Sequence, residues 1–215
     1  MTLDKLNIEA VKDHIVFKLI NRDAHEEKLK DVPYIDYMDL AIVFYYYIPE
    51  IHVDDGNISI MITNRNINEW KVDVNFLMEA AMENTPRLLG LRVRGIFSTI
   101  ADYLKDEELA QMAELEDINT PIYVATNNNA CHGASVILYK HMLQAMAAKV
   151  KSNLYIIPCS IHELIILQAI EDVEYDTTEL KEMIHYVNRN ELRPSDVLSD
   201  NLYFYNRVSG ELGIA

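Results

Sequence analysis

Apolar residues recur three and four positions apart in several stretches of the chain, and this spacing predicts amphipathic helices. The clearest such helices are predicted at residues 7–20, 73–84 and 176–190. Asp73 is suited to cap the second helix, and Pro86 follows its predicted end. The core faces of the first and last helices are predicted to consist of Ile8, Val11, Ile15 and Leu19, and of Leu180, Met183, Ile184 and Val187.

Runs rich in β-branched and aromatic residues predict strands. Residues 40–48 form the most pronounced run, and Pro49 is expected to end it. Residues 58–63 alternate apolar and polar side chains, and the turn-forming residues 54–57 separate the two runs. The pair is predicted to form an N-terminal antiparallel β-hairpin, with a connection longer than the tight two-residue kind.

The second half is predicted to centre on a strand–helix–strand unit. In order, this unit comprises a strand at 122–126, a polar turn at 127–129, a helix at 134–149 and a strand at 154–157. Ser160 and Glu163 then fit a capping box, which predicts that a short apolar helix begins there. Near the end of the chain, residues 201–207 are predicted to be a strand, and a turn at 209–210 leads to a last short strand.

These elements together predict an α+β fold, in which helices pack on a mixed or largely antiparallel sheet. The chain has 215 residues and shows no repeat, low-complexity tract or linker. We therefore expect a single domain over residues 1–215, and the pattern is compatible with two lobes at 1–118 and 119–215. From Ile96 the pattern is again helical, and the acidic stretch up to Asp117 is either a second, exposed helix or a mobile loop.

The net charge of −15 disfavours nucleic-acid binding through a basic groove and binding to anionic membranes. Two acidic clusters, within residues 102–117 and 171–182, are either solvated faces or a docking surface for a basic partner. The 13 tyrosines are typical of semi-buried surfaces or of an interface with a protein partner or a second copy. Two cysteines make no disulfide framework, and neither a leader pattern nor a membrane-spanning run is present, so we expect a cytoplasmic location.

Two loops of the central unit hold most of the candidate chemistry. In the first, Cys131 precedes the predicted helix start, where its thiol could act as a nucleophile beside His132. In the second, His162 and Glu163 lie in the predicted first helical turn and are candidates for acid–base work, although capping alone explains the glutamate. The candidate ligand-binding residues are Asn127, Asn129, Ser160 and Arg87.

The cysteines and histidines of these loops would converge if the loops lay side by side at one end of a shared sheet. The chain nevertheless has no paired cysteine motif, no His-Glu-x-x-His and no calcium loop, so we predict no metal site and no cofactor. A glycine-rich phosphate loop and a nucleophile elbow are absent as well.

Several segments are similar to those of an uncharacterised bacterial family of about this length. They include Asp39–Tyr46, Glu83–Arg87, Tyr123–Asn127, Ile157–Glu163 and Leu198–Tyr203, and the most distinctive are Asn-Thr-Pro-Arg and Ser-Ile-His-Glu. The resemblance extends over nearly the whole chain. It implies a shared fold, and because that family has no assigned activity it supplies no functional residue.

The function predicted first is a non-enzymatic interaction or accessory protein, since no catalytic constellation is evident. The alternative is a small-molecule-binding protein or a hydrolase-like enzyme that uses the loops at 127–133 and 158–163. An interaction protein should expose an apolar or tyrosine-rich patch, whereas an enzyme should gather Cys131, His132 or His162 in a concave pocket.

Overall fold

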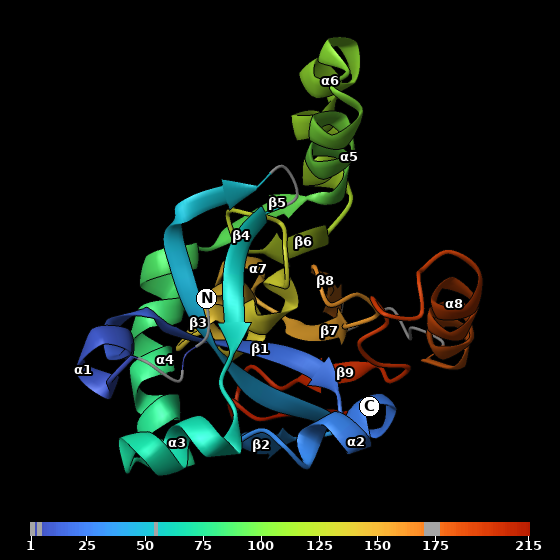
Figure 1. The fold of residues 1–215 in the computed structure, drawn as a ribbon. Helices are drawn as coiled ribbons and strands as arrows, with labels where there is room; N and C mark the ends of the chain where they lie inside the picture. Colours follow the sequence, from blue (N-terminus) through green and yellow to red (C-terminus); the bar gives the residue numbers. More distant parts are fainter. Residues whose placement is uncertain (1–2, 4–5, 54–55, 170–176) are drawn as a thin grey trace.

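The computed structural model describes residues 3, 6–53, 56–169 and 177–215, and within them two antiparallel sheets are surrounded by helices (Figure 1). This confirms the predicted α+β class. In chain order the described elements are α1 (Ile8–Val11), η2 (Lys12–His14), β1 (Ile15–Asn21), η3 (Asp23–His25), α2 (Glu26–Leu29), β2 (Tyr34–Tyr37), β3 (Leu40–Val53), β4 (Gly56–Met61), α3 (Asn64–Trp70), α4 (Val74–Leu89), β5 (Arg92–Gly95), α5 (Ile96–Leu104), α6 (Glu107–Asn119), β6 (Ile122–Thr126), η4 (Gly133–Leu138), α7 (Met142–Val150), β7 (Asn153–Ile157), β8 (Leu164–Ala169), α8 (Thr177–Asn190), β9 (Tyr203–Tyr205) and β10 (Leu212–Ile214).

The first sheet has the order β1-β3-β2. Strand β4 also pairs with β3, in antiparallel orientation, and the two strands form the predicted hairpin. Two details of that hairpin differ from the prediction. The strand continues past Pro49 to Val53, which is tolerated because β1 pairs with β3 only up to Tyr46 and makes no ladder with the proline. Val53 pairs with Gly56, so the connection contains only residues 54–55, which lie outside the described part.

The predicted helix at 7–20 is wrong over its second half, where the chain forms strand β1. Ile15, Phe17 and Leu19 point into the main core, whereas Val16 and Ile20 are buried in smaller clusters on the opposite face. A strand buried on both faces is apolar almost throughout, so its residues also satisfy a helical spacing.

The second sheet has six strands in the order β10-β9-β7-β8-β6-β5. The predicted strand–helix–strand unit is present as β6, the η4–α7 region and β7, but β8 lies between its two strands. Because β8 is antiparallel to both neighbours, the last residues of β6 and the first residues of β8 lie at the same end of the strands. This sheet takes strands from both sides of residue 118, and the division into two lobes stays a prediction.

Three helices differ in detail from their predictions. Helix α4 begins after the predicted Asp73 cap but includes Pro86 and ends at Leu89. The helix predicted at 134–149 is divided into η4 and α7, and His141, between them, has a positive φ of 65°. On α8, Ile184 is buried as predicted but Met183 is exposed.

Helix α4 is attached to the N-terminal strand by the Asn-Thr-Pro-Arg segment. The Asn84 side chain donates to the carbonyl oxygens of Lys12 and Ile15, and the Thr85 hydroxyl accepts from the backbone N–H of Phe17 at 3.1 Å. Arg87 donates to the carbonyl oxygen of Asp13 at 2.6 Å. These bonds satisfy backbone groups of η2 and of the first residues of β1, which explains why helix α4 carries polar residues at this point.

Candidate functional site

The two candidate loops meet at one end of the second sheet, where β6 ends and β8 begins. We call residues 127–133 and 158–163 the loop junction. The Thr126 hydroxyl donates to the carbonyl oxygen of His162 at 2.7 Å, and the Ala134 N–H donates to that of Ile161 at 3.2 Å. A Cβ atom on Gly133 would collide with the same His162 oxygen and with the Thr126 hydroxyl. The loops are therefore in close contact, as expected for neighbours at one end of a shared sheet.

Asn127 organises the first loop from within. Its side chain is fully buried; it donates to the carbonyl oxygen of Cys131 at 2.8 Å and accepts from the N–H groups of Asn129 and Cys131. Ala130 and His132 have positive φ values of 49° and 50°, which non-glycine residues adopt at some cost. The amide of Asn127 is thus engaged by its own loop, while the Asn129 side chain is exposed.

The two histidines of the loop junction lie beside each other, with ring centroids 5.9 Å apart. The backbone N–H of His132 donates to Nδ1 of His162 at 3.4 Å, and Nε2 of His162 lies 4.0 Å from a carboxylate oxygen of Asp196. Burial, assisted by the positive charges of Lys18 and His162, lowers the pKa of His132 to about 3. His132 is consequently neutral at physiological pH, and its buried Nδ1 has no hydrogen-bond partner among the described residues.

Lys18 is a member of this neighbourhood that sequence reasoning missed. It lies on β1, donates to the Ser59 hydroxyl at 2.8 Å and is placed over the Tyr45 ring at 4.1 Å. Burial lowers the pKa of its ammonium group to about 8, and a charge on Cys131 would counteract that shift. The only sequence signal was one lysine within an otherwise apolar run.

The helix predicted to begin at Ser160 is wrong, because residues 164–169 form β8. Pairing on both sides, with β6 and β7, buries the apolar run of β8 and outweighs the local capping signature. Ser160 instead accepts a hydrogen bond from the His162 N–H at 3.0 Å and bridges to Val197. Cys159 packs as a small apolar residue, and burial raises the pKa of its thiol.

A cavity of about 520 Å³ lies next to the loop junction, between α5 and the second sheet. Ala130 and Glu163 are the residues of the two loops that line it, together with Thr126, Arg92 and Arg94 from the adjoining strands. Cys131, His132 and His162 are not part of its lining. The structure brings His132 and His162 together, but outside the cavity. Arg87 is on α4, bound to Asn84 and Asp13, and does not line the cavity.

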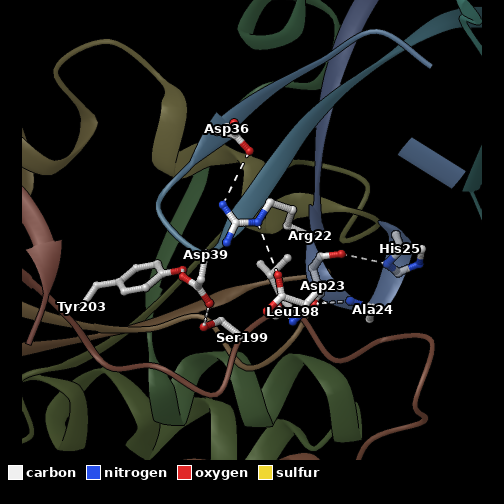
Figure 2. A network of polar contacts seen from close by, with 10 residues as sticks. Arg22, Asp23, Ala24, His25, Asp36, Asp39, Leu198, Ser199 and Tyr203 are labelled. Atoms are coloured by element: carbon white, nitrogen blue, oxygen red, sulfur yellow. Dashed lines mark hydrogen bonds and ion pairs between the residues drawn. The ribbon is translucent and has the colours of Figure 1, made fainter. Parts of the chain in front are cut away.

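A second polar cluster, which we call the polar lock, joins the two sheets (Figure 2). Asp39 accepts hydrogen bonds from the hydroxyls of Tyr203 at 2.5 Å and Ser199 at 2.6 Å. Both hydroxyl residues are fully buried, and burial together with the Asp39 carboxylate raises the pKa of Tyr203. Figure 2 also shows Arg22 beside Asp36. The distance between an Arg22 guanidinium nitrogen and an Asp36 carboxylate oxygen is 3.6 Å. Because no solvent reaches Ser199, the polar lock is suited to stabilising the fold.

The hairpin of α5 and α6 projects away from both sheets (Figure 1, top). Its large apolar side chains are solvent-exposed to an extent that is unusual for their type. They are Ile100, Tyr103 and Leu104 on α5 and Met112, Leu115 and Ile118 on α6, with exposed fractions from 41% to 87%. Sequence reasoning predicted an exposed helix here as one of two alternatives, and the structure confirms it.

Within the part of the chain that the structure describes, no three histidine, cysteine or acidic side chains are arranged to hold a metal ion. No described helix is both long enough and apolar enough to cross a membrane.

Comparison with known proteins identifies one family. Its model, described as "Family of unknown function (DUF5688)", matches residues 2–207, which is nearly the whole chain. No curated protein and no solved structure matches the chain.

Proposed function

This chain belongs to the DUF5688 family, whose function is unknown, and we propose that it is a non-enzymatic interaction module that docks a partner protein on helix α6. The observation that carries this proposal is the row of exposed apolar side chains Met112, Leu115 and Ile118, which we call the outer stripe. Exposed apolar surface of this kind is typical of interaction sites.

The outer stripe faces away from the rest of the molecule. Successive residues of an α-helix are about 100° apart, so Leu115 points about 160° away from Ala113. Ala113 is the buried residue of α6, with 1% of its surface exposed. Met112 and Ile118 lie about 60° to either side of Leu115. The helix thus has a narrow inner face on the hairpin and a separate apolar face toward solvent.

Capping hydrogen bonds hold the hairpin in a defined geometry. The outer stripe is therefore exposed on an ordered helix. The Asp117 carboxylate accepts from the N–H groups of Phe97 at 2.8 Å and Ser98 at 3.2 Å, which caps the start of α5. A Cβ atom on Gly95 would overlap that carboxylate. Asp106 caps α6 by accepting from the Leu109 N–H at 2.9 Å.

Charge indicates what kind of partner fits. Glu114 and Glu116 lie about 100° to either side of Leu115 and therefore flank the outer stripe. Lys105 is the only basic residue within residues 102–117. An amphipathic helix with an apolar face bordered by lysine or arginine would bury the outer stripe and neutralise both edges. A second copy of this acidic chain would bring like charges together, which disfavours self-association through this face.

The scale of the interaction is also consistent with docking. Full burial of one large aliphatic side chain contributes about 1.5–3 kcal/mol. Three such residues and the apolar face of the partner are buried together, and their joint gain has to exceed the cost of association and of ordering a peptide. We expect a dissociation constant no tighter than the micromolar range.

The experiment is a fluorescence-anisotropy titration with a labelled synthetic helix that has leucines on one face and lysines along both borders. We expect micromolar binding to the wild-type chain and at least tenfold weaker binding to the double variant Leu115→Gln/Ile118→Gln. The matched control is Met183→Gln/Tyr186→Gln, which removes two exposed apolar side chains from α8. A scrambled peptide of the same composition controls for charge alone.

Equal binding by the wild-type chain and the outer-stripe variant would contradict the proposal. Analytical ultracentrifugation of the wild-type chain and of the outer-stripe variant measures whether the chain forms dimers through this surface. A dimer that the outer-stripe substitutions dissolve would assign the surface to a second copy instead.

A second candidate function is a small-molecule-binding protein or hydrolase-like enzyme at the loops 127–133 and 158–163. The cavity of about 520 Å³ beside these loops favours it, since ligand sites commonly have this size. The two functions separate on substitution of Cys131 and His162. If Cys131→Ala or His162→Ala abolished function while the melting temperature held, the interaction proposal would lose its basis.

The proposed location is the cytoplasm. In support, Cys131 and Cys159 are not joined in a disulfide, and Cys159 packs in an apolar cluster. Free thiols are typical of proteins in a reducing compartment.

A further inference from the structure

The cavity between α5 and the second sheet has a mainly apolar wall with a small polar end. Ile96 and Ile100 form its α5 side, and Val124 and Ile165 form its sheet side. Its volume of about 520 Å³ is ample for an amino-acid-sized molecule. The apolar wall suits an aliphatic or aromatic group, and the polar end decides which head group such a molecule must have.

Two opposite charges line the polar end without neutralising each other. Arg92 and Glu163 both border the cavity, and both are half-buried. Among the hydrogen bonds and ion pairs of the described residues, neither side chain has a partner. Arg94, two positions along β5, is by contrast paired with Asp102. Half-buried charges are costly when unpaired, so this pair requires an explanation.

The strand register places these charges on either side of Thr126. Arg92 pairs with Thr126 across β5 and β6, and Leu164 pairs with Ala125 across β8 and β6. Glu163, immediately before Leu164, therefore lies next to Thr126 on its other side. Neighbouring strands are about 4.8 Å apart, which separates the Arg92 and Glu163 backbones by about 10 Å. Their long side chains can converge over Thr126 from both sides and leave room for a small group.

We propose that this cavity binds an apolar α-amino acid, with its carboxylate on Arg92, its ammonium group on Glu163 and its side chain against the apolar wall. Arginine binds a carboxylate through two parallel hydrogen bonds, and glutamate is a matched acceptor for an ammonium group. Thr126 lines the cavity between these two charged residues. Opposite charges at one end of an apolar cavity exclude a simple fatty acid or amine as the best ligand.

The experiment is isothermal titration calorimetry of the full chain with L-leucine and L-phenylalanine. Isoamylamine and 4-methylpentanoate, which each lack one charged group of leucine, and glycine, which lacks the apolar side chain, are the comparison ligands. We expect binding of the apolar amino acids, and roughly tenfold or greater weakening for each comparison ligand.

Variants test the two charges separately. Arg92→Gln and Glu163→Gln should each weaken leucine binding by roughly tenfold or more, and Arg92→Lys should weaken it less because the positive charge remains. The matched controls are Arg189→Gln and Glu191→Gln, exposed residues at the end of α8, which should leave binding unchanged. Melting temperatures measured alongside confirm that each variant is folded.

The proposal is overturned by any of three results. No binding of either apolar amino acid excludes the ligand class, and equal binding of the amine or the carboxylate excludes the zwitterion. Unchanged leucine binding by Arg92→Gln and Glu163→Gln places the ligand elsewhere. None of these results bears on the outer stripe of α6, whose residues do not line the cavity.

Discussion

The loop junction contains most of the reactive residue types of the chain, whereas the α5–α6 hairpin contains the exposed apolar surface on which the docking proposal rests. The loop junction contains both cysteines and two of the seven histidines, yet Cys159 is buried in an apolar cluster and Nδ1 of His162 accepts a hydrogen bond from the neighbouring backbone. The hairpin contains no cysteine or histidine, yet it leaves six large apolar side chains in solvent. If the docking proposal holds, exposed apolar surface indicates the site of this chain better than reactive residue types do.

The difference has an energetic basis. Polar groups at the loop junction can be explained by the need to satisfy buried backbone atoms, since an unpaired one costs about 1–3 kcal/mol. Exposed leucine and isoleucine on a capped helix meet no such internal need. Such side chains become useful when a partner covers them.

The largest expected effect comes from breaking the loop junction by Gly133→Ala. The added methyl group would overlap the carbonyl oxygen of His162 and the backbone nitrogen of Asn127, which cannot move without separating the loops. We expect a loss of about 3 kcal/mol in the free energy of unfolding, measured by urea denaturation. Gly213→Ala is the matched control, because nothing lies within 4 Å of its Cβ position. Equal losses in the two variants would show that the loops are not in close contact.

The next effect sharpens the comparison by testing a third region, the polar lock. Tyr203→Phe removes the hydroxyl that donates a hydrogen bond to the Asp39 carboxylate at 2.5 Å, and Tyr203 is fully buried. A hydrogen bond to a charged group contributes about 1.5–3 kcal/mol, and urea denaturation should detect a loss of that size. Tyr186→Phe, at an exposed position of α8, should change stability by less than about 0.5 kcal/mol. A similarly small loss at Tyr203 would contradict a structural role for the polar lock.

The burial of His132 predicts a pH dependence of stability. Its pKa is about 3 in the folded chain, against about 6.5 when unfolded, so the unfolded state binds more protons between these values. Stability should therefore fall as pH drops below about 6.5, by up to about 1.4 kcal/mol per pH unit from this group. Denaturant titrations from pH 7.5 to 5 measure the slope.

His132→Asn is the comparison variant for that slope, because asparagine does not titrate and tolerates the positive φ of 50°. The slope should be shallower in this variant than in the wild-type chain. Identical slopes would mean that His132 takes up its proton in the folded state, and is therefore accessible to solvent.

The smallest expected effect concerns the hairpin itself. The exposed fractions of Leu115 and Ile118 are 67% and 79%, so Leu115→Gln/Ile118→Gln should change the unfolding free energy by less than about 0.5 kcal/mol. Urea denaturation of this double variant and of the α8 control variant provides the measurement. A loss above about 1.5 kcal/mol would show that the outer stripe packs within the chain.

The sequence predicted those elements whose pattern is unambiguous. Strands β6 and β7, helix α8 and the Asp73 cap of α4 were recognisable because one face of each helix, or a bounded β-branched run, determines the structure. Strands β1 and β8 were missed for a shared reason. Both are apolar on two faces, and the local signals of the chain, a helical spacing before β1 and a capping box before β8, are outweighed by strand pairing.

The candidate sites were predictable only in part. The meeting of the two loops was a conditional expectation, which required them to lie side by side at one end of a shared sheet, and the structure places them in contact. The lowered pKa of Lys18 depends on burial by residues far away in the sequence, which no local pattern reveals. The outer stripe was detectable in principle, since Met112, Leu115 and Ile118 are three positions apart and opposite Ala113.

The most direct test of the docking proposal is reversal of charge along the outer stripe. The variant Glu114→Lys/Glu116→Lys keeps the apolar side chains and inverts both borders of the stripe. We predict that it loses affinity for the lysine-bordered helix and gains affinity for an otherwise identical glutamate-bordered helix, both measured by fluorescence anisotropy at moderate salt. Unchanged preference for the lysine-bordered helix would contradict the proposal that helix α6 recognises a basic amphipathic partner.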